Sequence, residues 1–294
     1  MFVSGFVSVI GRPNVGKSTL INSFLGQKLL IVSDKPQTTR NRIHAILTTE
    51  EAQVIFLDTP GIHKPRHRLG NYMVKSALGA LKEVELIIFM VEATSPPGPG
   101  DRYIAALLQE IDTPVFLVIN KMDLAPAQFE KEWLPLYLQQ GKFAKHFPVS
   151  ALQGKNLNPL LREIIKILPP GPQYYPPEMQ TDRPEEFLAA EMIREKVLLQ
   201  TREEIPHSTA VEIDSMELRE DRDILDVRAV IYVERDSQKG IIIGKNGAML
   251  KQIGTEARLE LENLLGNPIF LDLWVKVKKD WRRKDSYLRQ LGYE

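Results

Sequence analysis

The segment GRPNVGKS at residues 11–18 constrains the fold of this chain more than any other feature. It follows an alternating apolar run at 4–10 and precedes a helix-like run at 18–26. A glycine-rich loop between a strand and a helix turns several backbone N–H groups toward one point, where the helix dipole also favours an anion. We therefore predict a phosphate-binding loop rather than an ordinary turn. Its Lys17 would reach the β- and γ-phosphates, and the Ser18 hydroxyl would hold Mg²⁺.

The length and composition of the chain exclude several classes of protein. The 294 residues suffice for two domains with a core that needs no cross-links. Cysteine is absent, which excludes disulfides, thiolate catalysis and Cys-ligated zinc. The start of the chain lacks the features of a signal peptide, and apolar runs such as LIIFMV at 86–91 are too short to span a bilayer. We expect a cytoplasmic, monomeric protein.

Strand-like and helix-like segments alternate through residues 1–168. Runs such as VIFLD and PVFLVIN are almost continuously apolar, which is typical of parallel strands covered on both faces. The pattern predicts a doubly wound, mostly parallel α/β sheet. The expected strands are 4–10, 43–48, 53–58, 85–91, 114–119 and 145–149, and the expected helices are 17–25, 71–82, 101–111, 128–140 and 156–168.

A proline-rich segment, PPGPQYYPP at 169–177, separates two regions of different pattern. Proline disfavours helix and favours an extended, semi-rigid spacer. We therefore predict a linker at 169–180 and a second, smaller α+β domain at 181–294. Its expected helices are 184–202, 247–265 and 280–290, its expected strands are 208–217, 224–234 and 269–278, and a glycine-containing turn precedes residue 247.

Two further motifs follow predicted strands, where ligands of a doubly wound sheet bind. In DTPG at 58–61, Asp58 would hold Mg²⁺ through a water and Gly61 would offer its N–H to the γ-phosphate. In NKMD at 120–123, Asp123 can accept hydrogen bonds from N1 and N2 of guanine, and adenine lacks this pair of donors. Asn120 would bridge this loop to the phosphate loop.

The remaining nucleotide contacts complete a guanine site. The stem of Lys121 would cover the base, and the backbone at 150–152 would contact the guanine oxygen. Thr38 and Thr39 lie in the loop after the first helix, and we favour Thr39 as the residue that reaches Mg²⁺ in the GTP state. The predicted GTP-binding residues are Asn14, Val15, Gly16, Lys17, Ser18, Thr19, Asp58, Gly61, Asn120, Lys121, Asp123, Ser150, Ala151 and Leu152. The predicted metal ligands are Ser18, Thr39 and Asp58, and the predicted catalytic groups are Lys17, Thr39 and Gly61.

The residue that orients the attacking water is not evident. Ile62 follows DTPG, where Ras-like proteins carry a glutamine, so intrinsic hydrolysis should be slow. Asn14 could hold K⁺ beside the phosphates or could merely cap the loop. The basic cluster after Ile62 is formed by His63, Lys64, Arg66, His67 and Arg68. For His63 a solvated loop residue is the favoured interpretation over a catalytic one.

The run GIIIGKNG at 240–247 is the main motif of the second domain. A GxxG loop between two helices clamps about four nucleotides by their backbone in KH domains. The glycines permit close approach to phosphates, Lys245 neutralises charge, and the isoleucines would line the groove that receives the bases. The predicted RNA-binding residues are Ile241, Ile242, Ile243, Gly244, Lys245, Asn246, Gly247 and Lys251.

The charge distribution permits binding of nucleic acid although the net charge is zero. Residues 228–294 hold 13 basic and 9 acidic residues, whereas 176–227 hold 6 and 15. Affinity for a polyanion follows such local excesses rather than the net value. We expect Trp274 to pack in the core, and for Trp281 both core packing and base stacking remain open.

These motifs in this order resemble the translation-factor-like group of small GTPases, joined to a KH domain of the bacterial type. The combination of KPQTTR, DTPG, NKMD, GIIIGKNG and the ending DSYLRQLGYE resembles the Era family over the whole chain. The resemblance implies a GTPase switch that binds the 3′ end of small-subunit ribosomal RNA and assists 30S subunit assembly, with GTP favouring RNA binding. It also implies a peripheral contact with the inner membrane.

Two alternatives remain open at this point. In the first, the protein is an RNA chaperone or adaptor whose nucleotide site is mainly structural. In the second, it is a GTPase whose second domain binds a protein or a membrane rather than RNA.

Overall fold

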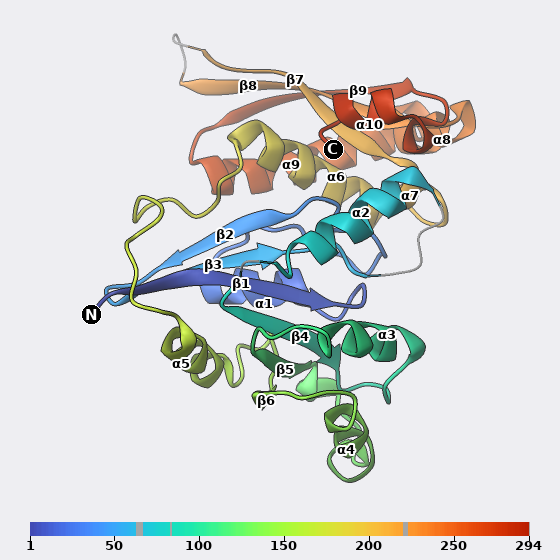
Figure 1. The fold of residues 1–294 in the computed structure, drawn as a ribbon. Helices are drawn as coiled ribbons and strands as arrows, with labels where there is room; N and C mark the ends of the chain where they lie inside the picture. The colour runs from blue at the N-terminus through green and yellow to red at the C-terminus, as the bar shows by residue number, and fades with distance from the viewer. Residues whose placement is uncertain (63–66, 83, 220–222, 294) are drawn as a thin grey trace. The chain divides into compact units, whose positions relative to one another are not determined.

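The computed structural model describes residues 1–62, 67–82, 84–219 and 223–293 (Figure 1). It divides into two compact units. The first comprises residues 1–30, 39–65 and 73–182, and the second comprises 31–38, 66–72 and 183–294. The two units are described separately below.

The first unit is built on a six-stranded sheet in the order β2-β3-β1-β4-β5-β6. The strands are β1 (Val3–Gly11), β2 (Ile43–Thr48), β3 (Ala52–Asp58), β4 (Leu86–Glu92), β5 (Val115–Asn120) and β6 (Lys145–Pro148). Only β2 runs antiparallel to its neighbour among these strands, so the sheet is mostly parallel, as the sequence predicts. Strands β3 and β5 are buried along their whole length, which accounts for their continuous apolar runs.

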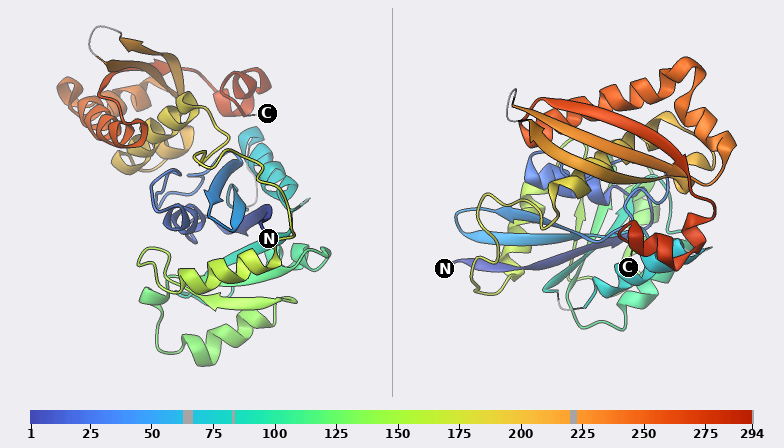
Figure 2. Two further views of the ribbon diagram at one scale, coloured as in Figure 1. Left: turned by 90° about the vertical axis from the view of Figure 1, so that its left-hand side faces the viewer. Right: turned by 90° about the horizontal axis from the view of Figure 1, so that it is seen from above.

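Helices cover both faces of this sheet (Figure 2). They are α1 (Lys17–Leu25), α2 (Arg68–Gly79), which belongs to this unit from Met73 onward, α3 (Pro99–Leu108), α4 (Leu134–Leu138) and α5 (Leu157–Ile167). Ala77 of α2, Ile104 of α3 and Tyr137 of α4 belong to one core cluster with Leu57 of the sheet. Phe24 of α1 stacks on Phe56, which follows Ile55 and precedes Leu57, so α1 packs on the opposite face.

The proline-rich segment lies against the first unit. Pro170 forms an isolated bridge with Val3, and Ser4 Oγ donates to the carbonyl of Pro172 at 2.6 Å. The Gln53 side chain accepts from the backbone N–H groups of Tyr174 and Tyr175. The segment is extended, as expected from its prolines, but these bonds fix it along the sheet, so it is not a free spacer.

The second unit carries a three-stranded sheet in the order β7-β8-β9. The strands are β7 (Ala210–Arg219), β8 (Ile224–Val233) and β9 (Ile269–Val277), and the helices are α6 (Glu185–Gln200), α7 (Ile205–Ser208), α8 (Asp236–Ile243), α9 (Ala248–Leu265) and α10 (Asp285–Gln290). Strand β8 is antiparallel to β7 and parallel to β9. Ile193 of α6 and Ala257 of α9 share a buried cluster with Ile231 of the sheet.

Three predicted elements differ from the structure. The glycine-containing turn expected after β8 includes helix α8, whose start is capped because the Gln238 side chain accepts from the N–H groups of Glu234 and Arg235. The expected helix 128–140 is a π-helical turn, Phe129–Trp133, followed by α4, which has Pro135 in its first turn. The expected helix 280–290 is a 3₁₀ turn, Trp281–Arg283, followed by α10. Proline lacks the N–H of a regular helix, which explains the interruption before α4.

Within the described part of the chain, no helix combines the length and the apolar character needed to cross a membrane.

Candidate nucleotide site and nucleic-acid groove

The phosphate loop takes its shape from two left-handed residues. Asn14 has φ 65° and Gly16 has φ 101°, directly before α1 begins at Lys17. A Cβ on Gly16 would lie 2.3 Å from the Asn120 side-chain nitrogen, so only glycine fits there. The Val15 side chain is buried, and its carbonyl accepts from Asn120 at 2.9 Å. Residue 15 can therefore contact a nucleotide only through its backbone.

Lys17 is buried at the base of this loop. Its Nζ donates to the carbonyl of Arg12 at 3.0 Å. Burial lowers the pKa of Lys17 to about 8, although the Asp58 carboxylate opposes the shift. A polyphosphate at the loop would add the negative charge that favours the protonated lysine.

Three oxygen-bearing side chains converge beside Lys17. Ser18 Oγ lies 2.9 Å from Asp58 Oδ2 and 3.2 Å from Thr39 Oγ1, and Thr39 Oγ1 lies 3.2 Å from Asp58 Oδ2. Asp58 is fully buried, its pKa is raised by burial, and its Oδ1 atom has no hydrogen-bond partner among the described residues. Hydroxyl and carboxylate oxygens are the donors that Mg²⁺ prefers, so this set fits the predicted ion.

The adjacent residues have different surroundings. The Thr38 hydroxyl donates to the carbonyl of Lys35 and lies 2.9 Å from Ser33 Oγ, so Thr39 is the threonine at the acidic group. A Cβ on Gly61 would lie only 2.6 Å from Pro13 N, because the backbone of DTPG packs closely against the phosphate loop. Thr19, the third residue of α1, lies next to Ser18 at the start of the helix.

The base-recognition motifs lie together on adjacent loops. Asn120 donates to Val15 and accepts from the N–H of Ala151 at 2.9 Å, so it connects three loops. Ser150 Oγ donates to Asp123 Oδ1 at 2.5 Å, which orients the Asp123 carboxylate. Lys121 has a left-handed backbone with φ 62°. The Leu152 side chain is 82 % exposed.

The expected catalytic region is only partly described. Ile62 is buried in the core of the first unit and offers no polar group to a water. His63, Lys64 and Arg66 of the basic cluster lie outside the described residues. His67 Nδ1 accepts the N–H of Gly70 at 3.0 Å, at the start of α2.

The GxxG loop lies between α8 and α9, in the order that the KH motif requires. Gly244 and Gly247 have φ 71° and 79°, and Asn246 between them has φ 53°. A Cβ on Gly244 would lie 2.7 Å from Met249 Cβ, whereas one on Gly247 would meet nothing within 4 Å. Gly244 is therefore required by the fold of the loop, while Gly247 leaves open space for a ligand.

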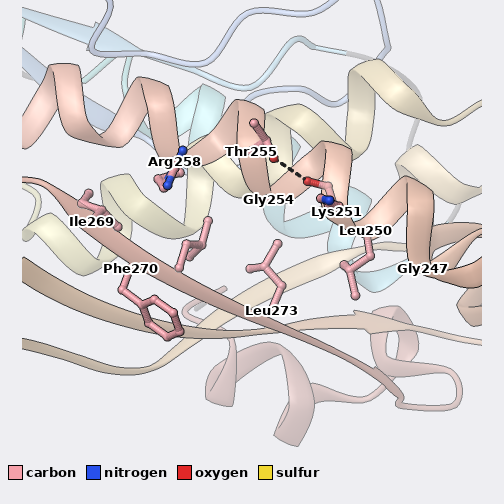
Figure 3. Close-up of a pocket in the computed structure, with 10 residues that line it drawn as sticks. Gly247, Leu250, Lys251, Gly254, Thr255, Arg258, Ile269, Phe270 and Leu273 are labelled. Atoms are coloured by element: carbon pink, nitrogen blue, oxygen red, sulfur yellow. Dashed lines mark hydrogen bonds between the residues drawn. The ribbon is translucent and has the colours of Figure 1, made fainter.

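A groove of about 470 Å³ runs beside this loop, between α9 and β9 (Figure 3). Its basic side chains, Lys251 and Arg258, come from α9 together with Gly254, and its apolar side comes from β9 and from Leu250 of α9. The lining residues are Gly247, Leu250, Lys251, Gly254, Thr255, Arg258, Ile269, Phe270, Leu271 and Leu273. The α9 residues that the sequence did not predict follow Gly247 at intervals of three or four. This spacing places them on one face of the helix.

The predicted role of the three isoleucines is wrong for the side chain of Ile242. Ile241–Ile243 form the last turn of α8, so their side chains point in different directions. Ile242 is fully buried in the core, Ile243 packs against that core, and Ile241 is 52 % exposed. The apolar lining of the groove comes from Leu250, Leu271 and Leu273 instead.

Of the two tryptophans in the second unit, Trp274 does not lie in the core as expected. Trp274 is 59 % exposed, because it alternates along β9 with the inward Val275. Trp281 is fully buried, and its Nε1 donates to the carbonyl of Ser208 at 2.8 Å. The core tryptophan is therefore Trp281, which is not available to stack on bases.

Family models match both halves of the chain. Residues 6–121 match a family of 50S ribosome-binding GTPases, and residues 204–282 match the KH domain. GTPase Era of Alkaliphilus metalliredigens is 52% identical over 293 residues, covering 100% of this chain and 99% of the relative. GTPase Era of Clostridioides difficile is 54% identical over 294 residues, with coverage of 100% of this chain and 99% of the relative.

Solved structures agree with these matches. A variant of Aquifex aeolicus Era bound to GDP and AlF₄⁻ has a TM-score of 0.95 and 43% identity, and 99% of each chain is covered. A structure of Era with MgGDPNP and nucleotides 1506–1542 of 16S ribosomal RNA has a TM-score of 0.93 and 44% identity, covering 100% of this chain and 99% of the other. The chain belongs to the Era family of GTPases.

Proposed function

We propose that this GTPase binds GTP and GDP with Mg²⁺ at the strand ends of the first unit, binds the 3′ end of small-subunit ribosomal RNA in the α9–β9 groove, and assists 30S subunit assembly. The observation that carries the RNA half is the open groove beside Gly247, with basic side chains from α9 along it. The Era structure with MgGDPNP and a 16S RNA fragment supports the same assignment by relation.

The nucleotide site would act mainly by positioning and by neutralising charge. Mg²⁺, when bound, would neutralise charge on the β- and γ-phosphates, and Ser18, Thr39 and Asp58 would hold it, Asp58 through a water. Lys17 would place its ammonium on the same phosphates, and the Gly61 N–H would donate to the γ-phosphate. Asp123, oriented by Ser150, would select guanine.

No polar side chain at residue 62 orients the water, so hydrolysis needs another contribution. Asn14 lies on the phosphate loop with its backbone in the left-handed region. We propose that its side chain helps to hold K⁺ beside the phosphates, where a second cation would stabilise the charge that develops during transfer. A capping role for Asn14 is the competing interpretation.

The division of the chain supports a link between nucleotide and RNA binding. Thr39 belongs to the first unit, whereas residues 31–38 belong to the second. Within the second unit, the N–H of Val32 donates to Glu195 at 2.7 Å, and Arg194 donates to the carbonyl of Thr38. A change at Thr39 on nucleotide exchange would therefore pull on a segment bonded to α6, as switch segments of GTPases do.

RNA crosslinking and sequencing from cells tests the RNA assignment, with matched glycine variants. Gly247 and Gly266 share φ 79° and both have open space at the Cβ position, but Gly266 ends α9 away from the GxxG loop. We expect Gly247→Asp to lose the RNA because its carboxylate repels phosphate, and Gly266→Asp to retain it.

The crosslinked RNA separates the possible functions. Enrichment of the 3′ end of small-subunit ribosomal RNA, lost in Gly247→Asp, supports the proposal. Enrichment of other RNAs keeps the groove but overturns the target. If the wild type crosslinks no RNA above background, the second domain is an adaptor for a protein or a membrane. The membrane case corresponds to the peripheral membrane contact that the resemblance implies.

A further inference from the structure

Glu92, the last residue of β4, lies between two cations of the nucleotide site. Its Oε2 accepts from Lys121 Nζ at 2.6 Å, and its Oε1 accepts from Arg12 Nη2 at 3.4 Å. Lys121 belongs to the base-recognition loop, and Arg12 belongs to the phosphate loop. One carboxylate therefore connects the two loops that hold opposite ends of a nucleotide.

The Arg12 end of this connection is anchored in the core of the unit. Arg12 Nε donates to Asp101 Oδ1 at 2.8 Å, and the Asp101 side chain is fully buried. The other Asp101 oxygen accepts the N–H of Gly98 at 2.9 Å, at the start of α3. A Cβ on Gly100 would lie 2.8 Å from Arg12 Cδ, so the arginine stem lies against the first turn of that helix. Arg12 is thus fixed independently of Glu92.

The position of the Lys121 side chain depends more on Glu92 than the position of Arg12 does. The sheet places the two residues, because Glu92 pairs with Asn120 in the β4–β5 register and the N–H of Ala93 donates to the Asn120 carbonyl at 2.8 Å. The Lys121 side chain is 32 % exposed and long, so it would have many rotamers if its ammonium lacked a partner. The Glu92 carboxylate favours the Lys121 rotamer that places the ammonium at the C-terminal end of β4.

We propose that Glu92 is a positioning residue for guanine nucleotides. It holds the Lys121 stem in place over the base and connects the base-recognition loop to the phosphate loop through Arg12. Glu92 does not contact the nucleotide itself. It slows nucleotide release because the Lys121 stem cannot leave the base without separating from a charged partner.

Release of the fluorescent nucleotide mant-GDP in a stopped-flow experiment tests this role. Glu92→Gln keeps the size of the side chain but removes its charge, and we expect release to become about tenfold faster, the effect of losing one charge-assisted hydrogen bond. Glu110→Gln removes a carboxylate from an exposed position of the same unit and should leave the rate unchanged. Equal rates for the two variants would overturn the proposal.

A double-mutant cycle separates positioning from a general loss of stability. Lys121→Ala removes the stem that Glu92 is proposed to hold, so Glu92→Gln should add no further acceleration in that background. Glu92→Asp keeps the charge and should restore part of the slow release. If the two substitutions accelerate release independently, their effects on the rate multiply. Glu92 would then act through the fold, which would overturn the proposal. No RNA is used, so the outcome is independent of the groove assignment.

Discussion

The proposed nucleotide site and the proposed RNA groove are built by different physical means. At the nucleotide site, polar side chains from separate strand ends bond one another, as Ser18, Thr39 and Asp58 do, and Asn120 joins three loops. The groove instead combines open space at Gly247 with an apolar strand, and a Cβ on Gly254 would lie 3.4 Å from Leu273 Cδ1 of that strand. Its charges come from exposed residues such as Lys251.

This difference predicts different sensitivities to mutation. A preorganised polar network loses affinity steeply when one member is changed, because its partners are left unsatisfied. An open groove that contacts a polyanion loses affinity in smaller steps, one contact at a time. Variants at the first site should therefore show large and base-specific effects, and variants at the second should show smaller effects that depend on salt.

The largest effect is expected for Asp123→Asn. The amide would present an N–H₂ group to the guanine donors, so preference for GTP over XTP should fall by about 10⁴-fold. Competition binding of GTP and XTP measures this change, with Asp112→Asn at an exposed position as the control. Unchanged selectivity would show that Asp123 does not read the base.

Gly16→Ala should weaken binding of GTP and GDP about 100-fold. The new Cβ would collide with the Asn120 side chain at a residue with φ 101°, which would separate the phosphate loop from the base-recognition loop. Gly79→Ala is the matched control, because nothing lies within 4 Å of its Cβ position. Isothermal titration with GDP compares the two, and similar affinities would contradict the described loop geometry.

Lys251→Ala should weaken RNA binding by about 5- to 10-fold in moderate salt and reduce the slope of log affinity against log salt by about one. Arg228→Ala changes an exposed residue of β8 outside the groove lining and serves as the control. Binding of a labelled RNA across a salt series measures both values. An equal loss for both variants would mean that the groove is not the contact surface.

Asn14→Ala should have the smallest effect. If Asn14 helps to hold K⁺, GTP hydrolysis by the wild type should be a few-fold faster in K⁺ than in Na⁺, and the variant should lose that difference. Steady-state phosphate release in the two salts gives the answer. A K⁺ effect that survives in the variant leaves Asn14 with only the capping role.

The motifs of the first unit predict where their residues lie better than the GxxG run does, for a physical reason. Motifs such as DTPG and NKMD follow buried apolar strands, and the carboxyl ends of parallel strands meet at one edge, so position along the chain predicts position in space. The run before GxxG predicts one surface of isoleucines, yet their helical periodicity buries Ile242. For Trp274, the alternation along β9 decided exposure, and a shift of one residue reverses it.

Some features depend on tertiary contacts that no local pattern contains. Glu92 ends a strand with no motif of its own, and its two cations come from segments about 80 and 29 residues away. The proline-rich segment was predicted to be extended, but its hydrogen bonds to Ser4 and Gln53 depend on how strands β1 and β3 pair.

The most direct test of the account is the affinity of the full chain for an RNA with the sequence of the small-subunit 3′ end, measured by fluorescence anisotropy with GDPNP, with GDP and without nucleotide. A coupling of typical size between nucleotide and RNA binding predicts that RNA binds at least about tenfold more tightly with GDPNP than with GDP. Gly16→Ala should abolish this difference. Equal affinity in all three states would contradict the switch and would indicate an RNA-binding protein whose nucleotide site only stabilises its fold.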